Sequence, residues 1–243
     1  MQMIPAALCL GLLLTSLQTS AQEHVVNGDF ETLTTCPLEP GDLYLAQGWH
    51  TQAGTPDFYH TCAEKQRPGL NALRNFNGYR TPYAGAGYAG LYVLYYQHWL
   101  PSKQAYRETE ALYNRLQRPL VVGKRYVVSF YVSRADSSEI SADSAYVTLT
   151  REPPAAGRRP GRQDLTTGLW LPNAPEWRRV AVEFTARQPF AYLWLSLPRE
   201  KIPFATYKST IDQGLGRRKS KRNRSLTAYY YIDNVSVAEM TPK

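Results

Sequence analysis

The sequence predicts an all-β protein, a two-sheet β-sandwich with one short peripheral helix. Several short segments alternate apolar and polar residues with a period of two, which is typical of half-buried strands. Turn-forming residues, among them 16 Gly and 17 Pro in 243 residues, separate these segments. Helical spacing is almost absent. Because sandwiches of ~200–250 residues form one domain, we expect a single domain over residues 22–243.

The first 21 residues have the pattern of a signal peptide. An apolar run from Ile4 to Leu17 is followed by the small residues Thr19, Ser20 and Ala21, which predicts export and a mature start at Gln22. No later segment has the ~20 apolar residues that a spanning helix needs. We therefore expect a secreted, periplasmic or outer-surface bacterial protein that is not membrane-embedded.

Two cysteines remain once the predicted signal peptide, with Cys9, is removed. Cys36 and Cys62 lie in a loop-rich region that includes Trp49, and an exported protein meets an oxidising compartment. We predict that they form a disulfide.

The remaining elements follow in chain order. A short first strand is expected over Val25–Glu31, and a helix over Ser102–Leu116, where Ser102 is a cap and Ala105, Leu112 and Leu116 have near-helical spacing. Alternation predicts further strands at Tyr88–Tyr96, Arg125–Ser133, Ala145–Thr150, Arg178–Phe184, Phe190–Leu197 and Tyr229–Val237.

The last strand carries a carboxylate, Asp233. Strict alternation places it on the same face as Val235 and Val237, toward a core where an unpaired charge is unfavourable. Asp29 and Glu31 of the first strand add two carboxylates, if the first and last strands lie side by side.

The predicted strands have aliphatic residues on one face and aromatic residues on the other. Flat rings with polar tips suit sugar stacking, because the C–H face of a pyranose packs on a ring. The alternative is that the rings pack under loops or against another protein. The candidate ligand-binding residues are Trp49, Tyr88, Tyr92, Tyr131, Tyr192 and Trp194.

The formal net charge of +8 is concentrated in one place. Arg217–Arg224 supplies six of the positive charges, within a basic loop expected at about 201–227. A nucleic-acid-binding domain usually spreads such charge over a folded face. We interpret the cluster as a solvated loop, with a polyanion-binding patch as the alternative.

Catalytic motifs are missing. The sequence has no Gly-x-Ser-x-Gly, His-Glu-x-x-His or phosphate-binding Gly loop, so we predict a non-catalytic protein. A glycosidase needs only two carboxylates at a suitable separation, which leaves Asp57, Glu64, Asp136 and Glu139 as candidates for that alternative.

Two motifs carry a family resemblance. Val26–Glu31 followed by Trp49, together with Tyr231–Val237, resembles carbohydrate-binding modules of the family 4/9/22 kind and the wider galactose-binding-like jelly rolls. Cys36-Pro37 and Gly87–Gly90 are more similar to uncharacterised bacterial surface domains that often precede an OmpA-like domain or a sorting tail.

The resemblance implies a jelly roll with adjacent first and last strands and a structural calcium at Glu31, Asp233 and Asp29. The alternative is that Asp233 accepts backbone N–H bonds without a metal. It also implies a secreted carbohydrate-binding module for a polysaccharide or cell-surface glycan. The competing interpretation is an envelope or adhesion protein whose aromatic face binds an envelope protein.

Overall fold

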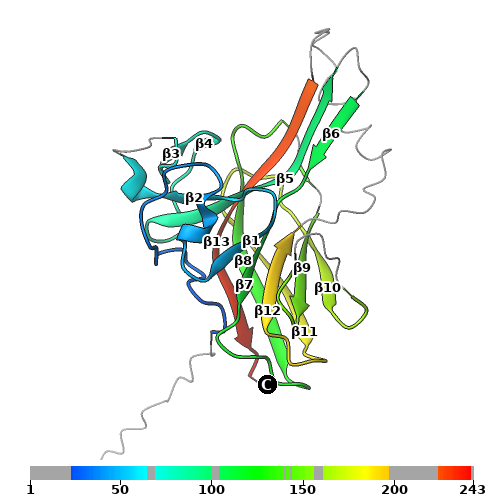
Figure 1. Ribbon diagram of the computed structural model, residues 1–243. Coiled ribbons are helices and arrows are strands. Elements are labelled where there is room, and N and C mark those ends of the chain that lie inside the picture. Colours follow the sequence, from blue (N-terminus) through cyan, green and yellow to red (C-terminus); the bar gives the residue numbers. More distant parts are fainter. Residues whose placement is uncertain are drawn as a thin grey trace, which may run out of the picture.

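The computed structural model describes residues 23–64, 69–99, 104–139, 141–142, 144–155, 161–196 and 224–241, and these form a two-layer β-sandwich (Figure 1). In one layer the strand order is β11 (Arg178–Thr185), β8 (Arg125–Arg134), β13 (Arg224–Glu239), β5 (Gly87–Trp99) and β2 (Asp57–His60), and β6 (Gln104–Glu108) also pairs with β5. This is the six-stranded sheet.

The second layer is a five-stranded antiparallel sheet. Its order is β1 (Trp49–Ala53), β7 (Ala111–Arg115), β12 (Tyr192–Ser196), β9 (Ser144–Thr150) and β10 (Leu165–Trp170). A small hairpin, β3 (Arg74–Asn75) with β4 (Gly78–Tyr79), and two short 3-10 helices, η1 (Asp42–Leu45) and η2 (Thr61–Glu64), complete the described elements. In this part of the chain no helix is long and apolar enough to cross a membrane.

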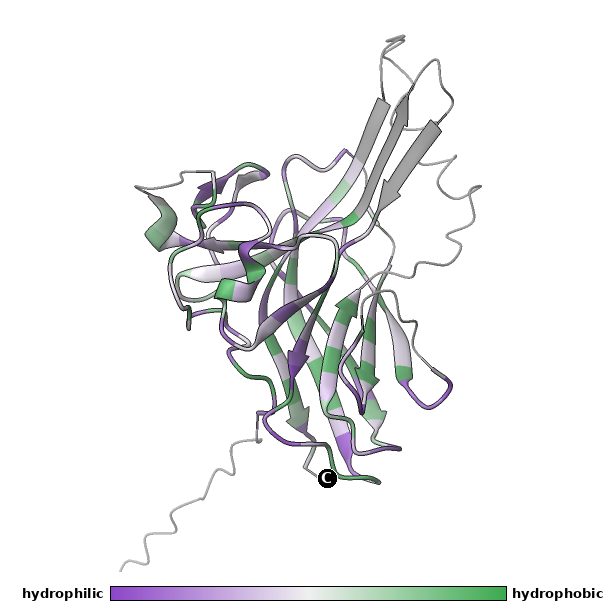
Figure 2. Ribbon diagram, in the orientation of Figure 1, coloured by the Kyte–Doolittle hydropathy of each residue, from purple (hydrophilic) through white to green (hydrophobic). Residues whose placement is uncertain are grey.

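The main hydrophobic core fills the space between the two sheets. Strands β5, β8, β9, β12 and β13 contribute alternate residues to it, and the described strands show green and pale bands in Figure 2. On β8, Tyr126, Val128, Phe130 and Val132 are buried in this core, and on β12 Leu193 and Leu195 face them from the other layer. The predicted all-β sandwich is confirmed.

The helix predicted over Ser102–Leu116 is wrong. Its described residues form β6 and β7, and burial alternates with a period of two: Leu112, Asn114 and Leu116 are buried, whereas Arg115 is exposed. Leu112 and Leu116 are four positions apart, a spacing that fits both the helical period of about 3.6 and the strand period of two. Pairing of β7 with β1 and β12 determines the conformation, since tertiary context overrides a weak helical preference.

A β-bulge in β13 contradicts the predicted position of Asp233. The main core contains Tyr230, Ile232, Val235 and Val237. These core residues are two positions apart, except for the three positions between Ile232 and Val235. The pairing with β8 shifts between Asp233 and Ser236, and Asn234 has a φ of 49°. Asp233 therefore lies on the face opposite to Val235 and Val237.

The N-terminal segment lies beside the end of β13, as predicted. The His24 N–H donates to the Val237 carbonyl (3.0 Å), and the Val235 N–H donates to the Gly28 carbonyl (2.8 Å). The expected strand over Val25–Glu31 is instead a turn, closed by a bond from the Phe30 N–H to the Asn27 carbonyl (3.2 Å). Positive φ at Asn27 and Phe30 prevents a regular strand there.

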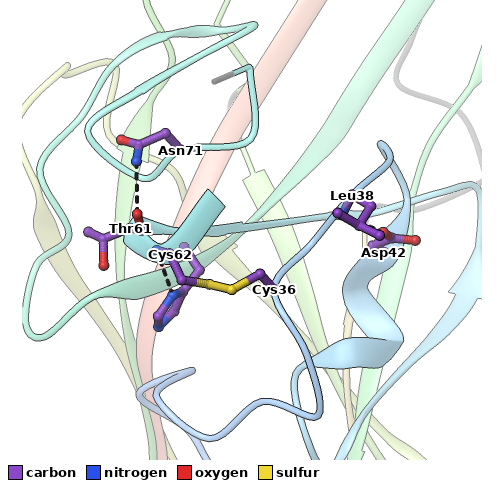
Figure 3. The surroundings of a disulfide bond; sticks show 7 residues. Cys36, Leu38, Asp42, Thr61, Cys62 and Asn71 are labelled. Carbon is purple, nitrogen blue, oxygen red and sulfur yellow. Dashed lines mark hydrogen bonds between the residues drawn. A yellow bond between two sulfur atoms is a disulfide. The ribbon is translucent and has the colours of Figure 1, made fainter. Parts of the chain in front are cut away.

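The predicted disulfide between Cys36 and Cys62 is confirmed. It joins the loop that precedes η1 to η2 (Figure 3), where the Asn71 Nδ2 also donates to the Thr61 carbonyl (3.1 Å). The bond therefore fixes two irregular segments to each other.

Two sequence predictions lie outside the described residues. These are the signal peptide over 1–21 and most of the basic loop, residues 201–223. The residues Arg224 to Thr227, which we assigned to that loop, belong to β13.

Candidate functional site

The six predicted ligand-binding residues do not form one surface. Trp49 belongs to the main core, where its ring stacks on Phe30 with centroids 4.8 Å apart and its Nε1 donates to the Asn27 carbonyl (2.8 Å). A buried, hydrogen-bonded indole cannot contact a surface ligand, so the prediction for Trp49 is wrong.

Tyr192 and Trp194 lie on the outer face of the five-stranded sheet. There one residue from each strand forms a row in register: His50, Tyr113, Trp194, Thr148 and Thr166. Trp194 is buried in this row, and its Nε1 donates to the Thr150 Oγ1 (3.2 Å). Tyr192 is half-buried near Tyr113. Only Tyr192 of the two is partly accessible to a ligand.

Tyr88 and Tyr92 lie on the outer face of the six-stranded sheet, on the other side of the sandwich. Tyr88 is buried in a second cluster, the tyrosine layer, whose tyrosines are Tyr59, Tyr88, Tyr229 and Tyr231, with Tyr92 packed against it. Residues 69–79 cover this layer, since Leu70 and Ala72 pack in the same cluster. The open aromatic platform that we predicted is therefore closed at Tyr88.

The hydroxyls of the tyrosine layer are hydrogen-bonded. The Tyr88 hydroxyl donates to the Ala72 carbonyl (2.5 Å), and the Tyr231 hydroxyl donates to the Asn75 Oδ1 (2.8 Å). Burial raises the pKa of both phenols well above the usual value, so they remain neutral donors.

Two buried carboxylates border this layer. Asp57 accepts bonds from the hydroxyls of Tyr59 (3.1 Å) and Tyr229 and from the Gly41 N–H (2.8 Å). Glu110 accepts bonds from the backbone N–H groups of Thr55 (2.9 Å) and Tyr92 (2.7 Å). Both carboxylates thus attach loops to the sheet.

Burial raises the pKa of Glu110 to about 7 and also raises that of Asp57. Sequence reasoning missed Glu110 because we assigned it to a helix. Its position directly before the apolar pair Ala111-Leu112 of β7 was the available signal.

The predicted metal ligands separate into two groups. Asp233 is buried and accepts bonds from the N–H groups of Tyr83 (2.9 Å) and Asn234 (2.6 Å), while Glu31 accepts bonds from those of Ala86 (2.7 Å) and Gly87 (3.0 Å). Burial, opposed by these bonds, raises the pKa of Asp233 to about 7, and the Glu31 charge adds to the rise. Asp29 is exposed in a surface groove.

These contacts fit the metal-free alternative, in which Asp233 accepts backbone N–H bonds. Among the residues that the structure describes, no three His, Cys, Asp or Glu side chains gather where they could hold a metal ion. Glu31 and Asp233 do bring two carboxylates close enough to influence each other, and oxygen ligands of this kind suit calcium. The calcium site stays a prediction.

Tyr131 lies in an open groove of about 450 Å³ beside the joined ends of the chain. The groove is bordered by the N-terminal segment, by β8 and by the bulge of β13, and it is lined by Glu23, Val25, Asn27, Gly28, Asp29, Ser129, Tyr131, Asn234, Val235 and Ser236. Within the described part of the chain, the side chains of Asp29, Ser129 and Asn234 form no hydrogen bond, so their polar atoms are available to a ligand.

Two further aromatic residues extend from Tyr131 at the side of the groove. The ring of Tyr83 stacks on Tyr131, with centroids 3.4 Å apart and planes 16° from parallel, and Trp177 stands edge-on to Tyr83 at 6.5 Å. Tyr83 is 41% exposed. Its position is set by Asp233, which accepts the Tyr83 N–H, and Trp177 is held by a bond from its Nε1 to the Thr81 carbonyl (2.8 Å). We call Tyr83, Tyr131 and Trp177 the aromatic edge.

Sequence reasoning identified Tyr131 but missed Tyr83 and Trp177. Both lie in segments that it assigned to turns and connections, and nothing local in the sequence brings them to β8. The Gly- and Pro-rich context of Tyr83 indicated a loop, and an aromatic residue in a loop is the only signal that was present.

No protein-family model and no curated protein matches the chain. Similar solved structures include the Clostridium thermocellum endo-1,4-β-D-xylanase 10B with its CBM22-1 and GH10 modules, in complex with xylohexaose (11% identity, TM-score 0.39, 91% of this chain and 29% of that one). Others are an exo-β-agarase (10%, 0.44, 90% and 26%) and the K2 cleaved adhesin domain of Lys-gingipain (12%, 0.40, 92% and 99%).

This chain thus spans less than a third of the xylanase and agarase chains, and almost the whole of the adhesin domain. With TM-scores below 0.5, these similarities carry no functional assignment.

Proposed function

We propose that this protein is a secreted, non-catalytic carbohydrate-binding module that holds a polysaccharide or cell-surface glycan in the groove beside Tyr131. The observation that carries the proposal is the combination of an open polar groove with the aromatic edge. A sugar ring needs a flat apolar surface for its C–H face and hydrogen-bonding groups for its hydroxyls. Tyr83 offers the first, and Asp29, Ser129 and Asn234 offer the second.

The stacking geometry determines which ring meets the ligand. One face of Tyr131 is covered by Tyr83, and the outward part of Tyr83 is exposed. A sugar therefore stacks on Tyr83, while Tyr131 supports that ring from below and presents its edge to the groove.

The carboxylates of the groove support a binding role over hydrolysis. Two line it, Glu23 and Asp29, and Glu23 is engaged in accepting the N–H groups of Val25 (2.8 Å) and Val237 (2.9 Å). A glycosidase requires two carboxyl groups on either side of an accessible glycosidic bond.

Affinity electrophoresis against a panel of soluble polysaccharides, followed by glycan-array binding, tests the proposal. We expect wild-type protein to be retarded by at least one glycan, and Tyr83→Ala to weaken that binding at least tenfold. The matched control is Trp170→Ala, because Trp170 is 71% exposed on β10 of the other sheet. Equal losses in both variants, or full binding by Tyr83→Ala, would remove the groove from this account.

A further inference from the structure

The β3–β4 hairpin displays three large apolar side chains to solvent. Leu73 is 47% exposed, Phe76 68% and Tyr79 61%, all within seven residues. Isolated exposed apolar residues are common, but a group of this size on one turn indicates an interaction surface. We call Leu73, Arg74, Phe76 and Tyr79 the hairpin tip.

The inward side of the same hairpin is firmly attached to the tyrosine layer. Asn75 donates from Nδ2 to the Tyr88 hydroxyl (2.9 Å) and accepts the Tyr231 hydroxyl, and Asn77 donates from Nδ2 to the Tyr59 hydroxyl (3.1 Å). In a mobile loop, exposed apolar residues need not form a defined surface. Here, buried hydrogen bonds hold the hairpin in one conformation with its apolar side outward.

A third attachment fixes the return strand. Asp136 accepts the Tyr79 N–H (2.9 Å) and forms an ion pair with Arg80 (3.0 Å). Because Asp136 neutralises Arg80, the charge left at the tip is that of Arg74, whose guanidinium carbon lies 5.1 Å from the Tyr79 ring centroid. Residues 69–80 include no Asp or Glu, and the tip is therefore apolar and cationic.

From this arrangement we infer that the hairpin tip inserts into the surface of a lipid bilayer that carries anionic headgroups. In Figure 1 the hairpin lies at the edge of the molecule, on the outer side of the six-stranded sheet. Aromatic rings favour the headgroup level of a bilayer, apolar side chains reach the acyl boundary, and an arginine pairs with lipid phosphate. The tip supplies each of these groups.

The small size of the tip favours a bilayer over a protein partner. A stable protein interface involves roughly 20–30 residues on each side, whereas the tip has four. A sugar would lack hydrogen-bonding partners at Leu73 and Phe76. A bilayer adapts to the tip and surrounds each side chain. This inference is independent of the groove and of the proposed function.

Co-sedimentation of the mature protein with vesicles provides the test. We expect binding to phosphatidylglycerol/phosphatidylethanolamine vesicles, weaker binding to pure phosphatidylcholine, and partial release at high salt, since screening weakens the attraction of Arg74. A Leu73→Ser/Phe76→Ser variant should bind at least tenfold more weakly, and Arg74→Glu should lose the preference for anionic lipid.

The control is Val121→Ser/Val122→Ser, which removes an exposed apolar pair from the turn before β8. It should bind like the wild type. Thermal unfolding of all variants should be unchanged, since the replaced side chains are exposed. No sedimentation of the wild type, equal losses in the control, or loss of glycan binding without loss of vesicle binding in the hairpin variant would overturn the inference.

Discussion

On the outer face of the six-stranded sheet, the rings of the tyrosine layer lie beneath residues 69–79, and the hydroxyls of Tyr59, Tyr88 and Tyr231 are hydrogen-bonded to these residues. On the outer face of the five-stranded sheet, Trp170 is exposed and Thr166 and His50 stand at the surface. Both faces carry aromatic residues at alternate positions. The difference shows that an aromatic sheet face serves two purposes. It attaches loops where tyrosine hydroxyls bond to the covering segment, and it forms open surface where a ring such as that of Trp170 projects into solvent.

The first prediction concerns the loss of one ring from each face. Tyr229→Ala deletes a fully buried ring and removes one of the three donors to the buried Asp57, so we expect a loss of about 3–5 kcal/mol in the free energy of unfolding. Trp170→Ala should change it by less than about 0.5 kcal/mol. Urea unfolding measures both, and similar losses would contradict the distinction between the faces.

The second prediction concerns the disulfide that joins the covering loops. A Cys36→Ser/Cys62→Ser variant should lose about 3.5 kcal/mol on the loop-entropy estimate for a separation of 26 residues. Thiol titration of denatured wild-type protein should find no free thiol. Stability equal to the wild type would show that the covering segment is held by its hydrogen bonds alone.

The third prediction is that two buried carboxyl groups, Glu110 and Asp233, make the protein less stable as the pH rises. The pKa values of Glu110 and Asp233 are raised to about 7 in the folded state, so the folded state binds their protons more tightly than the unfolded one. Their contribution is greatest below about pH 4, declines through pH 4–7 and is constant above that range. We expect about 3–4 kcal/mol per group as an upper estimate.

Glu110→Gln and Asp233→Asn should each flatten this dependence, measured as the urea midpoint from pH 4 to pH 8. A wild-type midpoint that rises over this range would contradict the assignment, and it would point instead to a ligand that requires the ionised carboxylates.

The fourth prediction concerns calcium as a ligand that requires the ionised carboxylates. If Glu31 and Asp233 bind it, calcium at 100 times its dissociation constant stabilises the protein by about 2.7 kcal/mol, and chelator removes this effect in the wild type. Because calcium requires ionised carboxylates, its contribution should rise with pH, opposite to the metal-free trend. Asp233→Ala serves as the control. Identical melting curves with chelator and with excess calcium would exclude the site.

Local alternation was enough to predict most of the sandwich. β8, β9, β11 and β13 are strands within a few residues of the predicted bounds. The disulfide Cys36–Cys62 could be predicted because these are the two cysteines left once the predicted signal peptide is removed. The helix over Ser102–Leu116 failed because two apolar residues four positions apart satisfy both periods, and only pairing with β1 and β12 distinguishes them.

The candidate site was less predictable. The alternation of residues along the strands predicts that Tyr88 and Trp194 face away from an aliphatic core. It does not predict which sheet a strand joins or which loop covers its outer face. The groove depends on contacts between residues far apart in sequence, such as Tyr83 on Tyr131, and on a bulge at Asn234 that a strict period of two does not anticipate.

The position of β13 also has a consequence for the order in which the strands can pair. This strand lies between β8 and β5 in the middle of the six-stranded sheet, and every other strand of that sheet precedes it in the chain. During synthesis, β8 and β5 have no partner between them until Arg224–Glu239 has emerged. Contacts of such long sequence separation form slowly, so we expect a folding rate limited by the arrival of β13 and a nascent chain that depends on chaperones until then.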